Sequence, residues 1–336
     1  MGATLAEIAA NAGVSQATVS RVLNEKPGVA PAKRRAVLTA LDLLGYERPS
    51  RLRTRTARPV GLLLPGLGNP IHAAFAQALA PNFARRGFNT VIGADSEGGL
   101  HEDEVIETFV ETGVAGILFV AGNHADAAQS TARYRTLRER GLPLGFVNGF
   151  RDDIDAPFFS LDDLAAMSLA VRHLAAMGHR RIGLACGPDS LVASQRAIDG
   201  YTAAMADSIG PDAETHVAHG LLSDDGGVSA ARSLIADGCT GIVCTSDLIA
   251  IGALAEARRN GLEVPERLSV VGLDDSILAR SSWPPLTTIR QPITQMGIAV
   301  ADAFVGEMNG IAASRTEYLF QPELVLREST GPAPRD

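Results

Sequence analysis

The stretch Thr4-Leu-Ala-Glu-Ile-Ala-Ala-Asn-Ala-Gly-Val-Ser-Gln-Ala-Thr-Val-Ser-Arg-Val-Leu-Asn24 decides how the N-terminal part of the chain folds. Its first half repeats apolar residues at the spacing of one helix face and predicts a short helix over 5–12, with Leu5, Ile8, Ala9 and Ala12 on that face. Gly13 supplies a turn, and Ser15 is a suitable N-cap for a second helix that buries Val19, Val22 and Leu23. Two helices joined in this way are typical of a helix-turn-helix, and an ordinary helical hairpin is the alternative.

These residues resemble the DNA-binding domain of the LacI/GalR family of bacterial repressors. The match runs without a gap over T-L-x-E-I-A-x-x-A-G-V-S-x-x-T-V-S-R-V-L-N. It continues into a third helix marked by Pro31, Lys33, Arg34, Arg35, Val37, Leu41 and Gly45-Tyr46. Further motifs recur to the end of the chain, so the resemblance covers nearly all 336 residues. Within the family, segments such as Gly45-Tyr46-Glu47-Arg48-Pro49 are most similar to the actinobacterial maltose-regulon repressors.

Composition and charge agree with this resemblance. The 336 residues are 46% hydrophobic and 20% charged, as in a globular protein of several domains. Residues 1–58 hold ten Lys and Arg against four Asp and Glu, a net charge of +6, whereas the remaining residues hold 20 against 34, a net charge of −14. A basic head on an acidic body indicates that DNA binds through the head alone.

Neither a membrane nor a metal is expected as a partner. The sequence shows no long apolar run and no signal segment, so we expect a cytoplasmic location. Its three cysteines, Cys186, Cys239 and Cys244, lack metal-ligand spacing and are predicted to be small buried residues. His216-x-x-His219 is more simply a solvated loop pair than a metal site.

The resemblance places Gln16, Ala17 and Arg21 where the family reads base edges in the major groove. Arginine favours guanine O6 and N7, and glutamine favours adenine. Short polar side chains suit phosphate contacts that fix register without specifying sequence, and the candidates are Thr4, Ser15, Thr18, Ser20 and Asn24. The alternative for each is a solvated helix face.

The stretch from Arg48 to Arg58 is basic, nearly without core residues, and predicts a linker. In the family, the corresponding segment forms a hinge helix on DNA, and a leucine from each hinge wedges into the minor groove. Leu52 is the candidate wedge, although the segment is shorter than in the lactose repressor. Arg51, Arg53 and Arg55 are candidates for minor-groove and phosphate contacts. A basic tether without a hinge helix is the alternative.

From Val60 onward, apolar runs alternate with amphipathic stretches. Buried parallel strands are predicted at Val60–Leu64, Thr90–Gly93, Ala115–Val120 and Pro143–Asn148, with helices near 72–86, 101–113 and 131–140. A second set has strands near 181–186, 215–218, 240–245 and 268–273, with helices near 163–177, 194–208, 225–237 and 247–260. Two such sets predict two doubly wound α/β lobes.

Pro284-Pro-Leu-Thr-Thr-Ile-Arg-Gln-Pro292 resembles the family's return crossing to the first lobe. The crossing places a helix over 292–308 in lobe one and the last strand, near 323–327, in lobe two. The predicted fold is therefore α/β, with an N-terminal helix-turn-helix domain followed by a two-lobed periplasmic-binding-protein-like (type I) ligand-binding domain. Its boundaries are 1–47 for the helix-turn-helix and 48–58 for the hinge, 59–159 plus 290–321 for lobe one, and 160–289 plus 322–330 for lobe two.

An enzymatic body is not favoured. The chain has no G-x-G-x-x-G, no G-x-x-x-x-G-K-[ST] and no G-x-S-x-G, so neither a cofactor nor a catalytic residue is expected. A sugar carrier of the same fold would have an export signal and would lack the basic head.

Polar residues at the predicted strand ends are candidate ligand contacts, because parallel strands bring their carboxyl ends to one cleft. The resemblance implies that Asp274 accepts a ligand hydroxyl and that Asn148, Ser246 and Gln291 line the pocket. Asn69 and His72 follow the first strand. Carboxylates and amides suit a polyhydroxyl ligand, and helix capping, above all by Asp247, is the alternative.

Arg196 and Trp283 are less direct candidates. In most family members the ligand-binding arginine aligns with Ala197, four residues before Tyr201. Arg196 is one position earlier and so points about 100° away around the helix. Trp283 either stacks on a sugar ring or packs at an interface, and the interface is favoured.

Together these features predict a cytoplasmic homodimeric repressor that binds a palindromic operator and is controlled by a small sugar effector, most simply maltose or maltodextrin. Another saccharide such as cellobiose, a nucleobase corepressor, and a carrier without regulatory DNA binding remain alternatives. Family analogy favours release of DNA by the sugar. The C-terminal residues lack apolar heptads, so no tetramerising coiled coil is expected.

Overall fold

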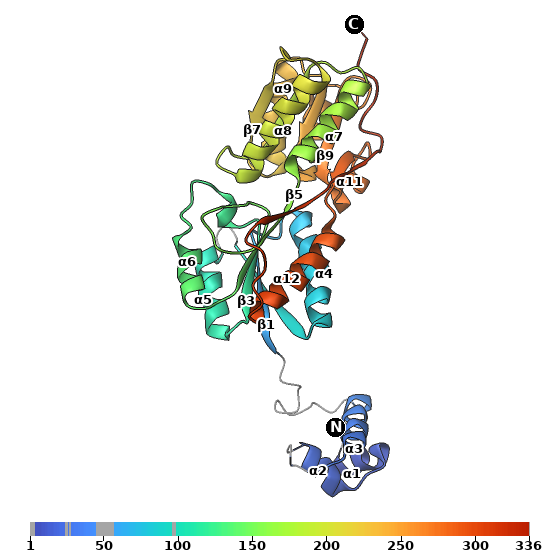
Figure 1. The fold of residues 1–336 in the computed structure, drawn as a ribbon. Coiled ribbons are helices and arrows are strands. Elements are labelled where there is room, and N and C mark those ends of the chain that lie inside the picture. Colours follow the sequence, from blue (N-terminus) through green and yellow to red (C-terminus); the bar gives the residue numbers. More distant parts are fainter. Residues whose placement is uncertain (1–3, 24–25, 27, 45–56, 96–98, 336) are drawn as a thin grey trace. The chain divides into compact units, whose positions relative to one another are not determined.

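The structure, a computed structural model, describes residues 4–23, 26, 28–44, 57–95 and 99–335 (Figure 1). The chain divides into two compact units, residues 1–57 and 58–336, which are described separately below. None of the helices in the described residues has the length and apolar character needed to cross a bilayer.

The N-terminal unit has three helices, α1 (Leu5–Ala12), α2 (Gln16–Leu23) and α3 (Pro31–Leu43). α1 begins in a capping box, in which the Thr4 hydroxyl accepts the Glu7 N–H and the Glu7 carboxylate accepts the Thr4 N–H. Gly13, at φ 62°, ends α1 in the left-handed conformation that glycine adopts without strain. The three helices share one small apolar core, in which Ile8, Val19, Val22, Val37 and Leu41 are fully buried. The predicted helix-turn-helix is confirmed.

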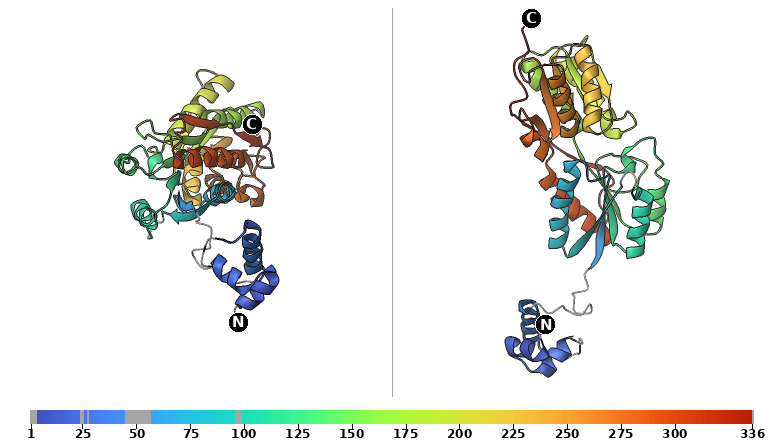
Figure 2. Two further views of the ribbon diagram at one scale, coloured as in Figure 1. Left: turned by 60° about the horizontal axis from the view of Figure 1, so that its bottom comes forward. Right: turned by 180° about the vertical axis from the view of Figure 1, so that it is seen from behind.

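The second unit contains two six-stranded sheets, one in each lobe (Figure 2). The order of the first sheet is β11-β5-β4-β3-β1-β2, and its strands are β1 (Ala57–Leu64), β2 (Phe88–Ala94), β3 (Gly116–Val120), β4 (Leu144–Val147), β5 (Phe158–Leu161) and β11 (Glu317–Phe320). Because side chains alternate along a strand, Leu62 and Leu64 pack toward one face and Leu63 toward the other. Helices α4 (Pro70–Arg85) and α12 (Ile293–Met308) cover the first face, and α5 (Glu102–Thr112) and α6 (Ala132–Glu139) cover the second.

The second sheet has the order β12-β10-β9-β8-β6-β7. Its strands are β6 (Ile182–Cys186), β7 (His216–His219), β8 (Gly241–Cys244), β9 (Ser269–Asp274), β10 (Thr287–Arg290) and β12 (Glu323–Val325). Helices α7 (Asp163–Ala176) and α8 (Val192–Ser208) pack on one face. Helices α9 (Asp224–Ala236), α10 (Asp247–Arg259) and the short α11 (Ile277–Ser281) pack on the other. Only β12 runs antiparallel to its neighbour, among the strand pairs of the described residues.

The chain crosses between the lobes three times, after β5, after β10 and after β11. The first crossing lies two residues later than the expected boundary at 159, because Ser160 and Leu161 still pair with β11. Arg290 likewise pairs with β9 and β12 and so belongs to the second lobe. The expected placement of a helix over 292–308 in lobe one and the last strand in lobe two is confirmed by α12 and β12.

Two strands predicted as part of the alternating pattern lie at sheet edges. Thr90–Gly93 was expected to be buried, but it belongs to edge strand β2, where Val91 is 37% exposed and Ile92 is 49% exposed. β7 is the corresponding edge of the second sheet and is also only partly buried. An apolar run thus predicts the strand, while its burial depends on its place in the sheet.

Candidate functional site

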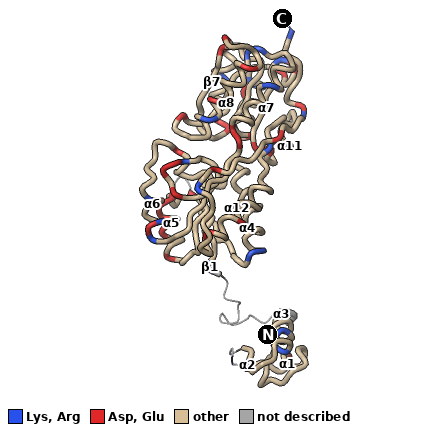
Figure 3. The backbone as a smooth tube through the Cα atoms, in the orientation of Figure 1, with Lys and Arg blue, Asp and Glu red and all other residues tan. Residues whose placement is uncertain are grey.

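The exposed surface of α2 carries the residues predicted to read DNA. Gln16 and Ala17 are the first two residues of the helix, and Arg21 lies one turn after Ala17 on the same side. All three side chains are exposed, while Val19 and Val22 point into the core. Lys33 and Arg35 on α3 are exposed as well. Figure 3 shows Lys and Arg positions, in blue, along α3. This surface is polar and basic, and the opposite, apolar side of α2 packs into the core of the unit.

Several residues predicted to contact phosphate serve as helix caps. Besides its place in the capping box, the Thr4 hydroxyl donates to Glu7 Oε2 at 2.9 Å. The Ser15 hydroxyl accepts the Thr18 N–H at 3.3 Å and lies 3.0 Å from the Thr18 hydroxyl. Ser20 is half-buried on α2. The candidates Asn24, Arg51, Leu52, Arg53 and Arg55 lie outside the described residues.

Between the two lobes lies a cavity with a volume of about 170 Å³. Both lobes and a crossing segment contribute polar side chains to its wall, namely Asn69, Asn148, Asp163, Ser194, Thr245, Ser246, Asp274 and Gln291. Five of the seven predicted effector contacts are among them: Asn69, Asn148, Ser246, Asp274 and Gln291. Parallel strands that end at one edge of each sheet account for this convergence.

The backbone is strained where it enters the cavity wall. Ala121, Asn148 and Asp274 have φ angles of 48°, 62° and 130°, in the region that disfavours side chains with a Cβ. Each follows or ends a strand, and each lines the cavity. Such backbone conformations cost about 1–3 kcal/mol each, persist only where the surrounding structure holds them, and are common at ligand-binding sites.

Asp274 has a partly unsatisfied carboxyl group deep in the cavity wall. Its side chain is 4% exposed, and Gln291 Nε2 donates to its Oδ1 at 2.7 Å. Asp274 Oδ2 and Gln291 Oε1 have no hydrogen-bond partner in the described part of the chain. Burial, together with the neighbouring Asp247 carboxyl group, raises the pKa of Asp274 well above its usual value. Two oxygens of cavity-lining residues are therefore left without a hydrogen-bond partner within the residues that the structure describes.

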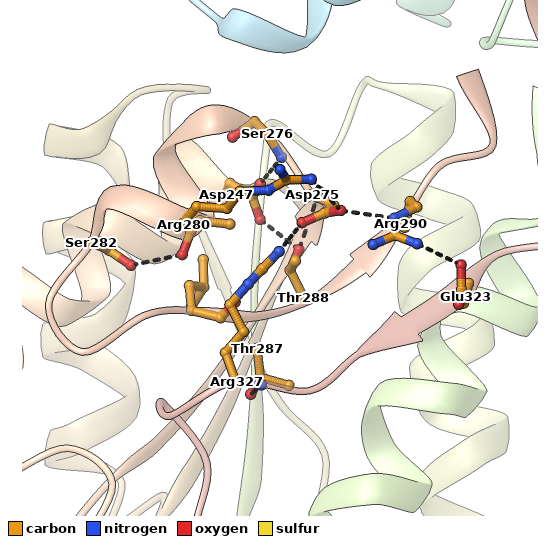
Figure 4. A network of polar contacts seen from close by, with 12 residues as sticks. Asp247, Asp275, Ser276, Arg280, Ser282, Thr287, Thr288, Arg290, Glu323 and Arg327 are labelled. Atoms are coloured by element: carbon orange, nitrogen blue, oxygen red, sulfur yellow. Dashed lines mark hydrogen bonds and ion pairs between the residues drawn. The ribbon is translucent and has the colours of Figure 1, made fainter. Parts of the chain in front are cut away.

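The residues around Asp274 have structural partners. The expected capping by Asp247 is wrong, because Ser246 caps α10 by accepting the Ile249 N–H at 3.1 Å. Asp247 instead accepts hydrogen bonds from the Ser276 N–H at 2.7 Å and the Thr288 hydroxyl at 2.6 Å (Figure 4). Asn69 caps α4 through the Ile71 N–H. Ser246 and Asn69 thus line the cavity while they hold its helices in place.

Asp275 lies at the centre of a cluster of arginines (Figure 4). Arg290 and Arg327 donate to its carboxylate, and Arg280 lies 3.8 Å away. Burial alone would raise the pKa of Asp275, but the hydrogen bonds from Arg327 and Arg290 outweigh that effect and lower it. Asp275 is therefore an ionised structural group beside the partly unsatisfied Asp274.

Two predicted effector contacts do not line the cavity. The His72 ring Nδ1 lies 3.0 Å from the Gly66 carbonyl oxygen, and burial lowers the pKa of this imidazole. Arg196, on α8, donates to both carboxylate oxygens of Glu317 on β11, at 2.7 and 2.9 Å, and its guanidinium lies 5.7 Å from the Phe150 ring centre. The neighbouring Ala197 lines the cavity in its place. Arg196 thus forms an ion pair between the lobes.

Asp163 is a cavity residue that sequence analysis missed. It is the first residue of α7, follows N-cap Asp162, and lies just past β5. The reasoning that placed polar residues at strand ends applies to it, but β5 was not predicted as a strand. Thr245, at the end of β8, was missed although its strand was predicted, and its buried hydroxyl has no hydrogen-bond partner among the described residues.

Trp283 lies away from the cavity and is 78% exposed. It cannot stack on a ligand held there. Surface hollows on either side of it are lined by Leu254 and Arg258.

Histidines and cysteines have structural partners in the second lobe. His216 lies 3.6 Å from Glu214 and 3.8 Å from Asp237, whereas His219 Nδ1 lies 2.9 Å from the Gly187 carbonyl oxygen. These two histidines belong to β7, not to a loop. The expectation that Cys186, Cys239 and Cys244 are buried is confirmed.

Comparison with known proteins identifies the family. Residues 4–49 match the bacterial regulatory proteins of the lacI family, and residues 171–330 match the periplasmic binding protein-like domain. The chain is 50% identical to the HTH-type transcriptional regulator MalR of Streptomyces coelicolor, over 99% of this chain and 98% of that protein. It is 32% identical to the regulator CelR of Thermobifida fusca, over 97% and 98% of the two chains. A solved structure of a CelR–cellobiose complex is 28% identical, with a TM-score of 0.72 over 97% of this chain and 99% of that one. The chain therefore belongs to the LacI family of DNA-binding transcriptional regulators.

Proposed function

We propose that this regulator is a homodimeric repressor of a palindromic operator and that a small saccharide, most simply maltose or a maltodextrin, controls it. The observation that carries the saccharide is the pair of buried, unpartnered acceptors in the cavity wall, Asp274 Oδ2 and Gln291 Oε1. Sugar hydroxyls can donate to these oxygens and accept from amides such as Asn148. The identity of 50% with a protein named MalR supports maltose within that class.

A second saccharide has specific support. The similarity to CelR, and to the structure of CelR with cellobiose, favours a β-linked glucan as the alternative effector. A nucleobase corepressor is less well supported, since no aromatic side chain is among the described residues that line the cavity. Planar bases are commonly held between aromatic faces, whereas the polar side chains that line this cavity suit a ligand rich in hydroxyl groups.

The size of the cavity indicates how the effector acts. Its volume of about 170 Å³ is smaller than the roughly 300–1,000 Å³ of most ligand sites. A saccharide of two rings therefore has to shift one lobe against the other. Saccharide binding and operator binding are then linked through the lobe arrangement, and we propose that the liganded arrangement releases DNA.

Dimerisation is proposed on the symmetry of a palindromic operator, which presents two equivalent half-sites. Trp283 is exposed and lies outside the effector cavity, so we assign it to the contact with the second copy. Sedimentation equilibrium should show a dimer for the wild-type protein and a weaker one for Trp283→Ala, while saccharide affinity per chain stays unchanged. A Trp283→Ala protein that dimerises like the wild type would contradict the assignment.

Calorimetry and footprinting test the function as a whole. We expect maltose or maltotriose to bind more tightly than cellobiose, trehalose and hypoxanthine, and the same sugar to release a protected palindrome upstream of the regulated genes. If cellobiose binds more tightly than maltose, a β-linked glucan replaces maltose as the proposed effector. Saccharide binding without a protected palindrome would indicate a carrier and overturn the repressor.

A further inference from the structure

We infer that Asp163 is a further effector-binding residue and that, with Asp274, it makes the cavity selective for uncharged saccharides over phosphorylated ones. This inference rests on the proposed control by a saccharide. To that proposal it adds a ligand contact from α7, and it specifies that the ligand is uncharged.

The position of Asp163 indicates a direct contact. It is half-buried, lines the cavity, and begins the helix that follows the first crossing between the lobes. Its neighbour Asp162 caps that helix by accepting the Ala165 N–H at 3.0 Å. Within the described residues, the Asp163 carboxylate accepts no hydrogen bond, so it is left for a donor in the cavity. A sugar hydroxyl is such a donor.

The charges on the cavity wall favour an uncharged ligand. The nineteen described lining residues include two carboxylates, Asp163 and Asp274, and no Lys, Arg or His. Arg196 is the cation whose field acts on Asp163, and Glu317 already holds its guanidinium at two oxygens. A phosphate group carries a charge of about −1.5 to −2 at neutral pH and would meet these two acidic groups, of which Asp163 is partly ionised at that pH, without a cation in the described wall to offset them.

Helix N-termini can bind phosphate through their free N–H groups, so it matters which helices at the cavity already have a side-chain cap. In three helices whose N-terminal ends line the cavity, α4, α7 and α10, a side chain already accepts one N–H of the first turn; the caps are Asn69, Asp162 and Ser246. A fourth, α8, has no side-chain cap. One helix terminus carries only about half a unit of positive charge, which is less than the full negative charge of Asp163 once it is ionised. The free N–H groups of α8 suit a sugar hydroxyl oxygen.

The protonation of Asp163 gives the selectivity a pH dependence. Burial raises the pKa of Asp163 to about 7; Arg196 on α8 opposes the rise, and Glu317 on β11 and Asp162 on α7 reinforce it. Near pH 6 the carboxyl group is mostly protonated, and near pH 8 it is mostly ionised. Rejection of a phosphorylated sugar should therefore be stronger at pH 8 than at pH 6.

Calorimetry on the full chain with matched sugar pairs tests the inference. The pairs are maltose with maltose 6′-phosphate, cellobiose with cellobiose 6′-phosphate, and trehalose with trehalose 6-phosphate. For the pair whose neutral member binds, we expect that member to bind at least about tenfold more tightly than the phosphorylated one. Asp163→Asn should weaken binding of the neutral sugar about tenfold, because it removes a charged hydrogen-bond acceptor. It should also reduce the preference for the neutral sugar over the phosphorylated one, because it removes a negative charge.

Asp199→Asn is the matched control, since it makes the same chemical change at an exposed position of α8 in the same lobe. It should leave both affinities unchanged. An unchanged operator affinity shows that Asp163→Asn is folded, and Asp163→Ser provides a second variant without the carboxylate.

Two results would overturn the inference while control by a saccharide stands. One is a phosphorylated sugar that binds as tightly as its neutral partner. The other is an Asp163→Asn protein with wild-type affinity and selectivity. If the wild-type protein binds its operator but none of the six sugars, the proposed saccharide control fails, and the inference fails with it. Calorimetry on the wild-type protein gives that result, so the two failures can be told apart before any variant is made.

Discussion

Asp274 and Asp275 are adjacent in the chain but have opposite environments. Asp274 faces the cavity with one oxygen unpaired, and burial raises its pKa. Asp275 faces Arg290 and Arg327, whose hydrogen bonds outweigh burial and lower its pKa. The chain turns between these two directions through φ angles of 130° and 54°. The strained turn separates a proposed binding group from a structural one.

At neutral pH we expect Asp274→Asn to stabilise the ligand-free protein and to impair saccharide binding. A carboxyl group whose pKa is higher in the folded than in the unfolded protein destabilises the fold as pH rises from the unfolded pKa, near 3.9, through the folded one. The melting temperature of Asp274→Asn should therefore exceed that of the wild type at pH 7 and nearly equal it at pH 4. A gain of 1 kcal/mol corresponds to roughly 2–4 °C in a domain of this size.

Asp275→Asn is the control for that experiment, with the opposite expected sign. Its lowered pKa means that the ionised carboxylate stabilises the fold at pH 7, and that this stabilisation is lost as pH falls through the folded pKa. Asp275→Asn should melt at a lower temperature than the wild type at pH 7. If both variants changed the melting temperature in the same direction, the assignment of Asp274 as an unsatisfied group would be wrong.

Arg21→Ala should reduce operator affinity by about 1–3 kcal/mol and reduce binding to random DNA by much less. The reason is that Arg21 is exposed on the outer side of α2, where a guanidinium can donate to guanine O6 and N7. Binding of both DNAs, measured at several salt concentrations, separates a base contact from a phosphate contact. Equal losses on both DNAs would assign Arg21 to the backbone.

At the scale of the element, sequence periodicity predicted the helices and most strands, but it missed three short strands. The helix predicted over 5–12 is α1, because its apolar spacing and Gly13 mark both ends. Strands β5, β10 and β11 have four residues each and were not predicted as strands. β4, β7 and β8 are equally short and were predicted, so length alone does not explain the difference. β10 lies in the stretch 284–292 that was interpreted as the crossing between the lobes. The missed β5 also concealed Asp163, since a strand-end residue is found only when its strand is known.

Arg196 shows a different limit of the sequence. The resemblance and the helical step of about 100° per residue correctly made its direction doubtful, and the structure directs it to Glu317. The partner lies more than a hundred positions away on the other lobe. Helical spacing gives the direction of a side chain on its own element, and only the packed lobes give its partner.

Thr4→Ala should destabilise α1 by about 1 kcal/mol, because it removes the hydroxyl of the capping box with Glu7. Hydrogen exchange of the α1 amides in the full chain measures this change, and Thr4→Ser, which keeps the hydroxyl, should behave like the wild type. If Thr4→Ala weakens DNA binding while α1 exchange stays unchanged, Thr4 contacts phosphate and is not chiefly a cap.

At the scale of the whole molecule, the contacts between the lobes determine how readily they separate. The Arg196–Glu317 ion pair joins α8 of one lobe to β11 of the other, with side chains 25% and 12% exposed. Nearby, the Ala127 N–H donates to the Ser190 carbonyl oxygen at 2.7 Å, which also joins the two lobes. If the proposed two-ring saccharide is the effector, we expect it to change these contacts as it binds, because the cavity volume is only about 170 Å³.

The ion pair therefore gives a test of the linkage between lobe arrangement and effector binding. If Arg196 and Glu317 act only through each other, Arg196→Gln and Glu317→Gln should change saccharide affinity in the same direction by similar factors. The double variant should then change it no more than either single one. The coupling energy expected for such a pair is about 1–3 kcal/mol, a factor of roughly 5–150. Titration of the four proteins with the bound sugar completes the double-mutant cycle.

If Arg196 touches the effector directly, Arg196→Gln loses affinity in the Glu317→Gln background as well, and the losses add. Additive losses would mean that Arg196 contacts the effector directly and does not act through its ion pair with Glu317. Non-additive losses accompanied by a matching shift in the sugar concentration that releases the operator would establish that the two lobes transmit the signal.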